Sequence, residues 1–451
     1  FAVILYCTVV PISVVVIWLI KKLLIGNLEE GDYPLWGRVY FRWWLQKRLY
    51  SLIPKEVLSN TPLYANLISA FGVKIKSKTQ LSHFEMGVEE LVEIGQNVTI
   101  SSNVVLNNAV VENGKLQLRK IYIADDAYLG TSCVVSGSCH IGIGGEIKDL
   151  SMLKKGERIP DYEIFEGSPA KSIGKKSPYE TVPEPALVKK MGYYATYILC
   201  VFLFPLLVLI PLAPSIISLY YLDEQADWYS FYYLFKTPFF ALLYILLFLT
   251  EVILLTRIFQ KDLRPGNYSI YSKTYIKKWF LDQLFSLSLL VLKPLFATVF
   301  ISRIYRAMGA KVGRNTEIST ATNVTHSLLK IGDESFIADD VSIGETEVRN
   351  QELQLQFTQI GNRSFIGNSA LIPQGYTLGD GMLVGVISLP PSPEQLANND
   401  FKDWFGSPSK PLPNREVLDH YPASLTYSPS FFRKIARALV EFLRALIPQS
   451  A

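Results

Sequence analysis

The sequence predicts an α+β membrane protein with two tandem left-handed parallel β-helix domains, built from hexapeptide repeats and linked by transmembrane and interfacial helices. A six-residue hydrophobic period, three long apolar stretches and an internal duplication predict this fold. In SFIGNSALIPQGYTLGDGMLVG (364–385) an aliphatic residue recurs at every sixth position. That period fits neither a helix nor an ordinary strand, but it is typical of a parallel β-helix, in which every sixth side chain points inward.

The composition favours a membrane protein and excludes several functions. Of 451 residues, 49% are hydrophobic and only 19% are charged. The net charge of +4 is small and no basic stripe with interleaved aromatic residues is present, so no nucleic-acid partner is expected. The four cysteines form neither a disulfide framework nor a CxxC pair, and no metal site is expected. The absence of HExxH, Walker A and GxSxG argues against zinc proteases, P-loop enzymes and α/β-hydrolases.

Three stretches are long and apolar enough to cross a bilayer. Residues 1–26 predict a transmembrane helix, and residues 189–258 predict a transmembrane hairpin of two helices. Positive residues flank the same side of all three, and the acidic turn DEQAD (223–227) lies on the other. By the positive-inside rule, we expect a multi-pass protein of the cell inner (plasma) membrane, with both β-helix domains cytoplasmic. A signal peptide is the alternative for the first stretch, but its positive charges follow the apolar run.

An internal duplication sets the domain boundaries. LEEGDYPLWGRVYFRWW (28–44) matches LRPGNYSIYSKTYIKKW (263–279) at an offset of 235 residues, and the offset becomes 237 further on. GSPAK (167–171) later matches GSPSK (406–410). The predicted parts are interfacial helical linkers at 27–71 and 259–308, β-helix domains at 72–176 and 309–412, and a C-terminal segment at 413–451. Both chain ends are expected to be cut from a longer series of repeats.

Two further features lie outside the regular repeat. NNAVVENGKLQLRK and GETEVRNQELQLQF interrupt the period at the same place in each unit, which predicts a protruding loop or hairpin there. SPSFFRKIARALVEFLRALIP predicts a basic amphipathic helix with its apolar residues along one face. Such a helix suits an anionic membrane surface, so membrane lipid is an expected partner. A helix packed wholly against protein is the alternative.

Several motifs resemble a known family. The hexapeptide blocks resemble left-handed β-helix acyltransferases, and GSPAK resembles their frequent ending. The combination of membrane helices with FIADDVSIG, SFIGNSALIPQG, LVGVIS and WFGSP closely resembles the C-terminal region of ε-poly-lysine synthetase and related nonribosomal-peptide-synthetase-like enzymes. The resemblance covers nearly the whole chain. It is weaker in the first unit, where SSNVVLNN stands in place of ADDVSIGE.

The resemblance implies an amide-forming acyltransferase-like module for poly-amino-acid synthesis. It would join an amino acid held as a carrier thioester to an amino-acid or peptide amine. No cofactor is expected on this region itself; the 4'-phosphopantetheine arm would come from an upstream thiolation domain, and ATP would be used by an upstream adenylation domain. A third homologous repeat and a homo-oligomer are also compatible with this interpretation. The alternatives are a CoA-dependent hexapeptide acyltransferase acting at the membrane and a non-catalytic membrane scaffold.

Candidate site residues follow from the chemistry of amide formation, which needs a base and a donor for the oxyanion. The catalytic candidates are His326, His140, Asp339 and Asp340. Candidates for binding substrate or the thioester arm are His83, Glu89, Asn368, Ser369, Ser168 and Ser407. Each has a structural alternative: an exposed histidine without a role, a corner residue bonded to its own backbone, or a plain turn. His420 is expected to be a surface residue.

Acyltransferases of the β-helix type are generally trimers with sites between subunits. We therefore expect the two prisms to pack side by side like linked subunits, with a tunnel between them. The loop at 107–119 or 344–356 would lie near the other domain.

Overall fold

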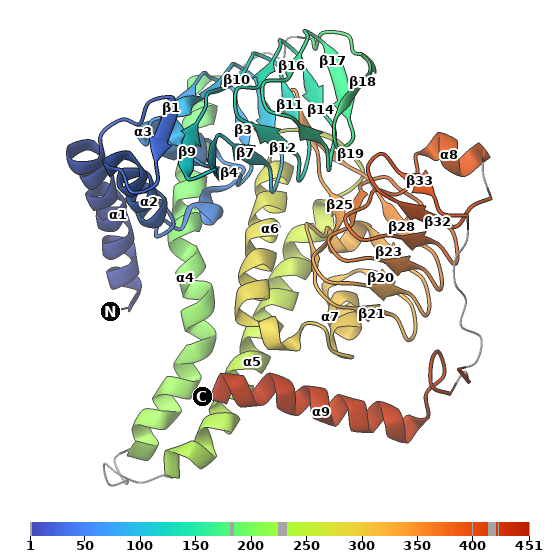
Figure 1. Cartoon of the computed structure of the whole chain (residues 1–451). Helices are drawn as coiled ribbons and strands as arrows, with labels where there is room; N and C mark the ends of the chain where they lie inside the picture. Colours follow the sequence, from blue (N-terminus) through green and yellow to red (C-terminus); the bar gives the residue numbers. More distant parts are fainter. Residues whose placement is uncertain are drawn as a thin grey trace. The chain divides into compact units, whose positions relative to one another are not determined.

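The structure is a computed structural model of the chain, and it describes residues 2–180, 185–223, 232–398, 400–413, 421–422 and 424–450 (Figure 1). The chain divides into two compact units. Unit 1 comprises Phe1–Phe202, Ser269–Tyr271 and Glu347–Leu353, and unit 2 comprises Leu203–Tyr268, Ser272–Thr346 and Gln354–Ala451. His420 and most of the DEQAD turn lie outside the described residues.

Among the described residues, three helical segments are long and apolar enough to cross a membrane: Thr8–Ile25, Leu187–Tyr221 and Lys236–Asp262. The long helices are α1 (Ala2–Ile20), α2 (Arg38–Tyr50), α4 (Leu187–Asp223), α5 (Tyr232–Phe259), α6 (Lys273–Val291) and α9 (Phe431–Ser450). Shorter helices are η1 (Lys21–Ile25), η2 (Lys55–Leu58), α3 (Pro62–Ala70), η3 (Glu89–Leu91), η4 (Gln260–Asp262), η5 (Lys293–Leu295), α7 (Ile301–Met308), η6 (His326–Leu328) and α8 (Pro393–Asn398).

The strands of unit 1 form three largely parallel sheets, which are the faces of one stack of coils (the first stack). One face contains β2 (Lys74–Ile75), β5 (Val92–Ile94), β10 (Ile121–Ile123), β13 (His140–Ile141) and β16 (Arg158–Ile159). The next contains β3 (Gln80–Leu81), β6 (Thr99–Ile100), β11 (Tyr128–Leu129), β14 (Glu146–Ile147), β17 (Glu163–Glu166) and the antiparallel β18 (Lys171–Lys175). The third contains β4 (Glu85–Met86), β7 (Val105–Asn107), β12 (Val134–Ser136) and β15 (Met152–Leu153).

A second stack of coils is built in the same way. One face contains β20 (Lys311–Val312), β23 (Leu329–Ile331) and β28 (Thr358–Ile360). The next contains β21 (Glu317–Ile318), β24 (Phe336–Ile337), β29 (Phe365–Ile366), β31 (Leu383–Val384), β32 (Asp403–Phe405) and the antiparallel β33 (Lys410–Pro411). The third contains β22 (Ala321–Thr322), β25 (Val341–Glu345) and β30 (Leu371–Pro373). Apart from the hairpin strands, consecutive strands fall on successive faces from β2 to β17 and from β20 to β30, so each turn of the coil uses three six-residue repeats.

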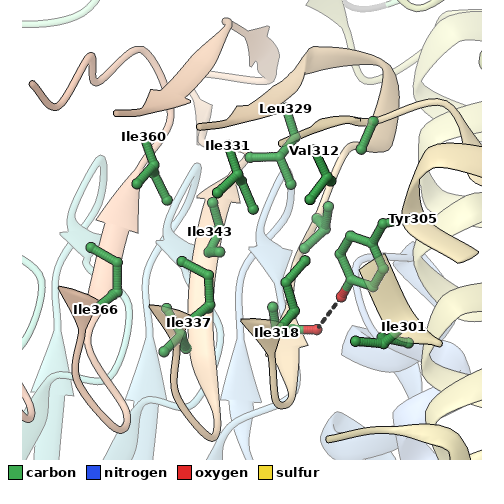
Figure 2. Close-up of a cluster of buried hydrophobic side chains, with 14 of the residues drawn as sticks. Ile301, Tyr305, Val312, Ile318, Leu329, Ile331, Ile337, Ile343, Ile360 and Ile366 are labelled. Atoms are coloured by element: carbon green, nitrogen blue, oxygen red, sulfur yellow. Dashed lines mark hydrogen bonds between the residues drawn. The ribbon is translucent and has the colours of Figure 1, made fainter. Parts of the chain in front are cut away.

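The six-residue period places aliphatic side chains in register inside the second stack. Ile318 pairs with Ile337, and Ile337 with Ile366, so these side chains lie in one line through the core (Figure 2). All three are at most 1% exposed. Tyr305 on α7 covers one end of this core and donates a hydrogen bond to the Ala321 carbonyl at 3.4 Å (Figure 2). Parallel coils with an aliphatic core are therefore confirmed.

Polar corner residues link one coil to the next. The Asp333 carboxylate accepts a hydrogen bond from the Arg314 amide at 2.6 Å, and the Asn362 side-chain oxygen accepts one from the Asp333 amide at 2.7 Å. The Asp380 carboxylate accepts one from the Asn362 amide at 2.7 Å. These bonds satisfy backbone donors that the corners remove from the ladder.

The predicted interruptions of the period are β-hairpins. In unit 1, β8 (Ala109–Glu112) pairs with β9 (Lys115–Leu118), which also pairs with β1 (Gly31–Pro34). The corresponding excursion of the second stack forms β26 (Val348–Arg349) and β27 (Glu352–Leu355), with β19 (Gly266–Ser269) beside β27.

Candidate functional site

His326 lies in a buried aromatic environment at the start of η6. Its ring centroid lies 5.1 Å from that of Phe285 on α6 and 5.0 Å from that of Tyr305 on α7, both in edge-on geometry. Burial, with a smaller contribution from Lys278, lowers the pKa of His326 to about 3. The imidazole is therefore neutral at pH 7 and a weak base. Among the described residues, its Nε2 has no hydrogen-bond partner.

The charge near this histidine belongs to an ion pair on α6. Lys278 is 3% exposed and pairs with the carboxylate of Asp282, one helical turn further on. Burial raises the pKa of Asp282, and the neighbouring ammonium opposes that shift.

A more polar group of side chains lies in unit 2 at the corner of the coil where β25 ends and the hairpin of β26 and β27 begins. We call this group the polar corner. Its residues are Asn323, Thr325, Ser327, Ser342, Glu345, Thr358 and Gln374. They come from three successive coils at one corner of the stack: Asn323 and Gln374 follow β22 and β30, Ser342 and Glu345 lie on β25, and Thr358 begins β28 of the adjacent face.

Glu345 is the charged residue of the polar corner. The Asn323 side-chain nitrogen donates to Glu345 Oε2 and to Ser342 Oγ, both at 3.1 Å. The Ser342 hydroxyl also donates to Glu345 Oε2, at 3.2 Å. Two neutral donors, the Asn323 amide and the Ser342 hydroxyl, thus hold this carboxylate oxygen in place.

Several buried polar atoms of the polar corner have no hydrogen-bond partner in the described part of the chain. Within the described parts of the chain, no hydrogen bond is made by Thr325 Oγ1, Ser327 Oγ, Thr358 Oγ1 or Gln374 Oε1. Thr358 is 2% exposed and Gln374 is 8% exposed. A buried polar atom left unpaired costs about 1–3 kcal/mol, so such atoms are expected where a bound molecule satisfies them. The corner combines an anion with hydroxyls that can donate to a developing oxyanion.

Gly344 keeps the backbone close to this group. Its φ is +69°, in the region that favours glycine, and an added Cβ would lie 2.9 Å from Thr358 Oγ1. A side chain at this position would therefore occupy the space next to that hydroxyl.

The other second-stack candidates take part in corner geometry. Asp339 accepts hydrogen bonds from the hydroxyls of Ser319 and Thr320, and its amide donates to Asn368 Oδ1 at 3.1 Å. Asp340 and Ser369 have φ values of +55° and +53°. These contacts correspond to the structural alternative, and a catalytic role for these residues stays a prediction.

The outward candidates lie on exposed edges. His140 is exposed and stacks on Tyr122, with ring centroids 4.7 Å apart and an interplanar angle of 21°. Ser168 lies in the turn between β17 and β18, and Ser407 lies in the turn between β32 and β33. Their roles also stay predictions.

His83 and Glu89 lie in separate surroundings in unit 1. The His83 ring lies 3.5 Å from the Tyr64 hydroxyl through Nδ1 and 3.7 Å from the Glu56 carboxylate through Nε2, and burial lowers its pKa. Glu89 is 3% exposed, pairs with Lys21 at 3.6 Å and accepts a hydrogen bond from Gln46. Burial raises its pKa, and Lys21 opposes that shift.

Another carboxylate of unit 1, Glu146, is fully paired. It is 1% exposed and contacts Arg349 at 2.9 Å, Lys148 at 3.0 Å and Lys176 at 3.4 Å. Burial alone would raise its pKa, but Arg349 and Lys148 together lower it to about 2. Such a network stabilises an anion and leaves it little capacity for further donors.

Sequence reasoning did not find the polar corner. The available signal was the interruption GETEVRNQELQLQF, which begins with Gly344 and Glu345. Asn323 and Thr358 carry no motif, because their proximity depends on the coil that separates them.

Comparison with known proteins decides the family. The chain is 36% identical over 457 aligned positions to delta-poly-L-ornithine synthetase of Acinetobacter baumannii, covering 98% of this chain and 34% of that protein. It is 32% identical over 165 residues to serine acetyltransferase of Bacillus pumilus, covering 35% of this chain and 73% of that enzyme. This chain is similar, along almost its whole length, to a region of a poly-amino-acid synthetase, and it contains a region of the serine acetyltransferase family.

These relatives are named as a synthetase and as acetyltransferases. The chain spans about a third of the length of the poly-ornithine synthetase. No protein-family model matches it. Among solved structures, a galactoside acetyltransferase in complex with coenzyme A is 15% identical over 35% of this chain and 95% of that chain, with a TM-score of 0.26; at that score the match adds nothing to the assignment.

Proposed function

We propose that this region forms the amide bond in a membrane-bound poly-amino-acid synthetase, joining a carrier-bound aminoacyl thioester to an amino-acid or peptide amine. The observation that carries the proposal is the 36% identity to a poly-ornithine synthetase along almost the whole chain. The two stacks would be tandem domains on the cytoplasmic side of the inner membrane. The 4'-phosphopantetheine arm and the use of ATP would belong to upstream thiolation and adenylation domains.

In this reaction the amine nitrogen attacks the thioester carbonyl carbon. The carbon–nitrogen bond forms, the carbon–sulfur bond breaks, and the proton lost by the amine ends on the departing thiol. The polar corner supports these steps because it combines a carboxylate with buried hydroxyls that have no hydrogen-bond partner in the described part of the chain. Glu345 would hold the incoming ammonium and receive its proton, and Thr358 or Ser327 would donate to the oxyanion.

His326 would have a different part. Its neutral, buried imidazole suits a hydrogen-bond acceptor or a packing role better than a general base. The exposed His140 remains the alternative base on the first stack.

A CoA-dependent acyltransferase is the second candidate, because the chain also matches serine acetyltransferases. The two candidates differ in the acyl donor. They are separated by supplying the full-length enzyme either with its own loaded carrier domain or with the corresponding aminoacyl-CoA.

The test uses the full-length synthetase in nanodiscs, with its carrier loaded in separate reactions with radiolabelled L-ornithine and L-lysine. Chain growth is followed by mass spectrometry. Glu345→Gln and Thr358→Val should retain carrier loading and lose product by at least about tenfold, since one transition-state hydrogen bond of about 1.4 kcal/mol corresponds to that factor. Glu352→Gln, an exposed glutamate of the adjacent hairpin, is the matched control. Normal product from both corner variants would reject the polar corner as the site.

A further inference from the structure

The loop at 296–299 of unit 2 leads from η5 into α7, and it contains a strained residue. Ala297 has a φ of +56°, in the left-handed region that residues other than glycine, asparagine and aspartate rarely adopt. Its amide donates to the Ser319 carbonyl at 3.1 Å, so the turn also joins the loop to the second stack. A backbone conformation of this kind persists only where the surrounding structure holds it.

The equivalent turn of unit 1 is supported by side chains close to it. At the offset of 237 residues, Asn60 corresponds to Ala297, and its φ of +61° is nearly the same. Asparagine tolerates this conformation better than alanine does. The Asn60 carbonyl accepts a hydrogen bond from the Gln80 side chain at 3.0 Å, and its Oδ1 accepts one from the Ser82 hydroxyl at 2.7 Å. Pro62, two residues further on, has no amide hydrogen and so needs no acceptor.

In unit 2 the helix α9 supplies the corresponding support. Arg444 of α9 donates to the Ala297 carbonyl at 2.9 Å, as a glutamine does in unit 1. Val299 replaces the proline, and its amide donates to Glu441 Oε2 of α9 at 2.6 Å. This carboxylate also lies near the beginning of α7, where unpaired amides and the helix dipole favour an anion. We call Glu441 and Arg444 the clamp.

Two further side chains of α9 fix the clamp on unit 2. Arg437 donates through Nε to Glu441 Oε1 at 2.8 Å, and its other nitrogens pair with Glu317 on β21. Lys434 donates to the side-chain oxygen of Asn315 at 3.1 Å. The charged residues in this part of α9 therefore bond to protein.

The opposite face of α9 is apolar and exposed. Its residues recur at the spacing of one helical face and are at least 45% exposed: Phe432, Ile435, Leu439, Val440 and Leu443. The helix packs against α5, which contains a candidate membrane span (Figure 1). An amphipathic helix beside a span suits the headgroup layer, into which its apolar face is buried by about 5–10 Å.

The loop held by the clamp determines where α7 begins. Tyr305 of α7 lies against the ring of His326, with the centroids 5.0 Å apart, and donates to the Ala321 carbonyl at 3.4 Å. The order of the loop therefore affects one end of the second stack.

We propose that α9 binds the headgroup layer of the bilayer and thereby keeps the clamp closed on the loop at 296–299. Its apolar face lies in lipid, and Glu441 and Arg444 hold the loop on the opposite face. Order at the beginning of α7 then depends on the bilayer, whereas the equivalent turn of unit 1 is supported by its own side chains. The inference does not depend on the proposed reaction, because it is measured without turnover.

Hydrogen–deuterium exchange of the full-length synthetase in phosphatidylcholine nanodiscs tests the clamp. Glu441→Ala removes the acceptor of the Val299 amide and should speed the exchange of that amide about tenfold. Arg433→Ala is the matched control, because Arg433 lies on the same helix but donates to the Ser424 carbonyl, outside the loop. The segment at 59–64 of unit 1 should exchange at the wild-type rate in both variants, which confirms that they are folded.

The contact with the bilayer is tested on the other face of α9. Leu439→Glu and Leu443→Glu together place two charges on the apolar face and leave the clamp residues unchanged. If lipid keeps the clamp closed, this double variant should raise the exchange of the Val299 amide towards the rate of Glu441→Ala. A photo-crosslinking benzoylphenylalanine introduced at Leu439 should form adducts with lipid, detected by mass spectrometry.

Three outcomes would overturn the assignment. Wild-type exchange of the Val299 amide in Glu441→Ala would show that α9 does not hold the loop. Wild-type exchange in the Leu439→Glu and Leu443→Glu double variant would show that the clamp does not depend on the apolar face. Crosslinks from position 439 to protein instead of lipid would show that another part of the synthetase covers this face.

Discussion

Asn108 and Glu345 occupy equivalent positions in the two units, yet their hydrogen-bond partners differ: Asn108 bonds to the backbone, and Glu345 bonds to side chains. Asn108 is 1% exposed; its Oδ1 accepts from the amides of Gly87 and Val88 at 2.9 and 3.0 Å, and its Nδ2 donates to the Val88 carbonyl at 2.7 Å. Glu345 instead joins a partly exposed group with unpaired atoms nearby. A duplicated coil therefore does not carry duplicated contacts: the asparagine of unit 1 bonds to the backbone, and the glutamate of unit 2 bonds to the side chains of Asn323 and Ser342.

A second pair of equivalent positions, Glu89 and His326, shows the same divergence in a buried place. Glu89 pairs with Lys21 at the end of the first span, and this cation opposes the rise in the pKa of Glu89 that burial causes. His326 lies among aromatic rings, and burial lowers its pKa to about 3. Both side chains are buried, so their neighbours set how far burial shifts each pKa.

The largest expected effect is a loss of stability when the cation that pairs with Glu89 is removed. Lys21→Met should destabilise unit 1 by about 3–5 kcal/mol, because it leaves Glu89 and Glu90 buried without their cation. Chemical denaturation in detergent measures the change. The exposed neighbour Lys22→Met is the control, and Glu89→Gln added to Lys21→Met should recover part of the loss. A Lys21→Met protein as stable as the control would contradict the ion-pair argument.

His326 should make stability depend on pH. Its pKa is about 3 when folded and about 6.5 when unfolded, so the unfolded state binds more protons between these values and stability falls as the pH falls. The expected loss from pH 6.5 to pH 5 is about 2 kcal/mol. His326→Phe should remove that dependence. Equal pH slopes for the two proteins would show that the ring is not held neutral.

The next effect compares the two corners directly. Asn108→Ala should cost about 1–3 kcal/mol of stability, because two backbone amides lose their acceptor. Glu345→Ala should cost less than about 1 kcal/mol but abolish product formation by the full-length enzyme. Thermal melts and the chain-growth assay distinguish them. If Asn108→Ala lost activity without losing stability, the division between a structural and a chemical corner would be wrong.

The smallest effect concerns α9, whose two faces differ. Arg437 and Arg444 contact Glu317 and the backbone of Phe296 and Ala297, so the basic face meets protein. Leu439 and Val440 are 58% and 66% exposed. We expect this apolar face to enter the lipid headgroup region and its binding to depend little on anionic lipid.

Spectroscopy can test this orientation of α9. A fluorophore at Leu439→Cys should be quenched by brominated lipids in nanodiscs, and one at Arg437→Cys should be quenched much less. Equal quenching at the two positions would contradict the orientation. Arg437→Ala should change stability by less than about 1 kcal/mol, because its ion pair is nearly half exposed.

The sequence by itself determined the local order of this protein. A six-residue period specifies which side chains face inward, because the direction of each side chain depends only on residues close to it in the sequence. The line of core residues Ile318, Ile337 and Ile366 follows from this period. The apolar stretches predicted the three candidate membrane spans, and sequence motifs indicated the resemblance to poly-amino-acid synthetases. The similarity to a poly-ornithine synthetase confirms that resemblance.

Only the tertiary structure decided which residues meet. Asn323 and Glu345 are one coil apart, and Thr358 follows a hairpin, so no spacing in the sequence marks them as a group. The sequence also did not predict the environments of His326 and Glu89, because the side chains that contact them lie on helices distant in the sequence. Protonation and pairing depend on burial and on neighbours brought together by the coil, and these are properties of the packed chain rather than of any local pattern.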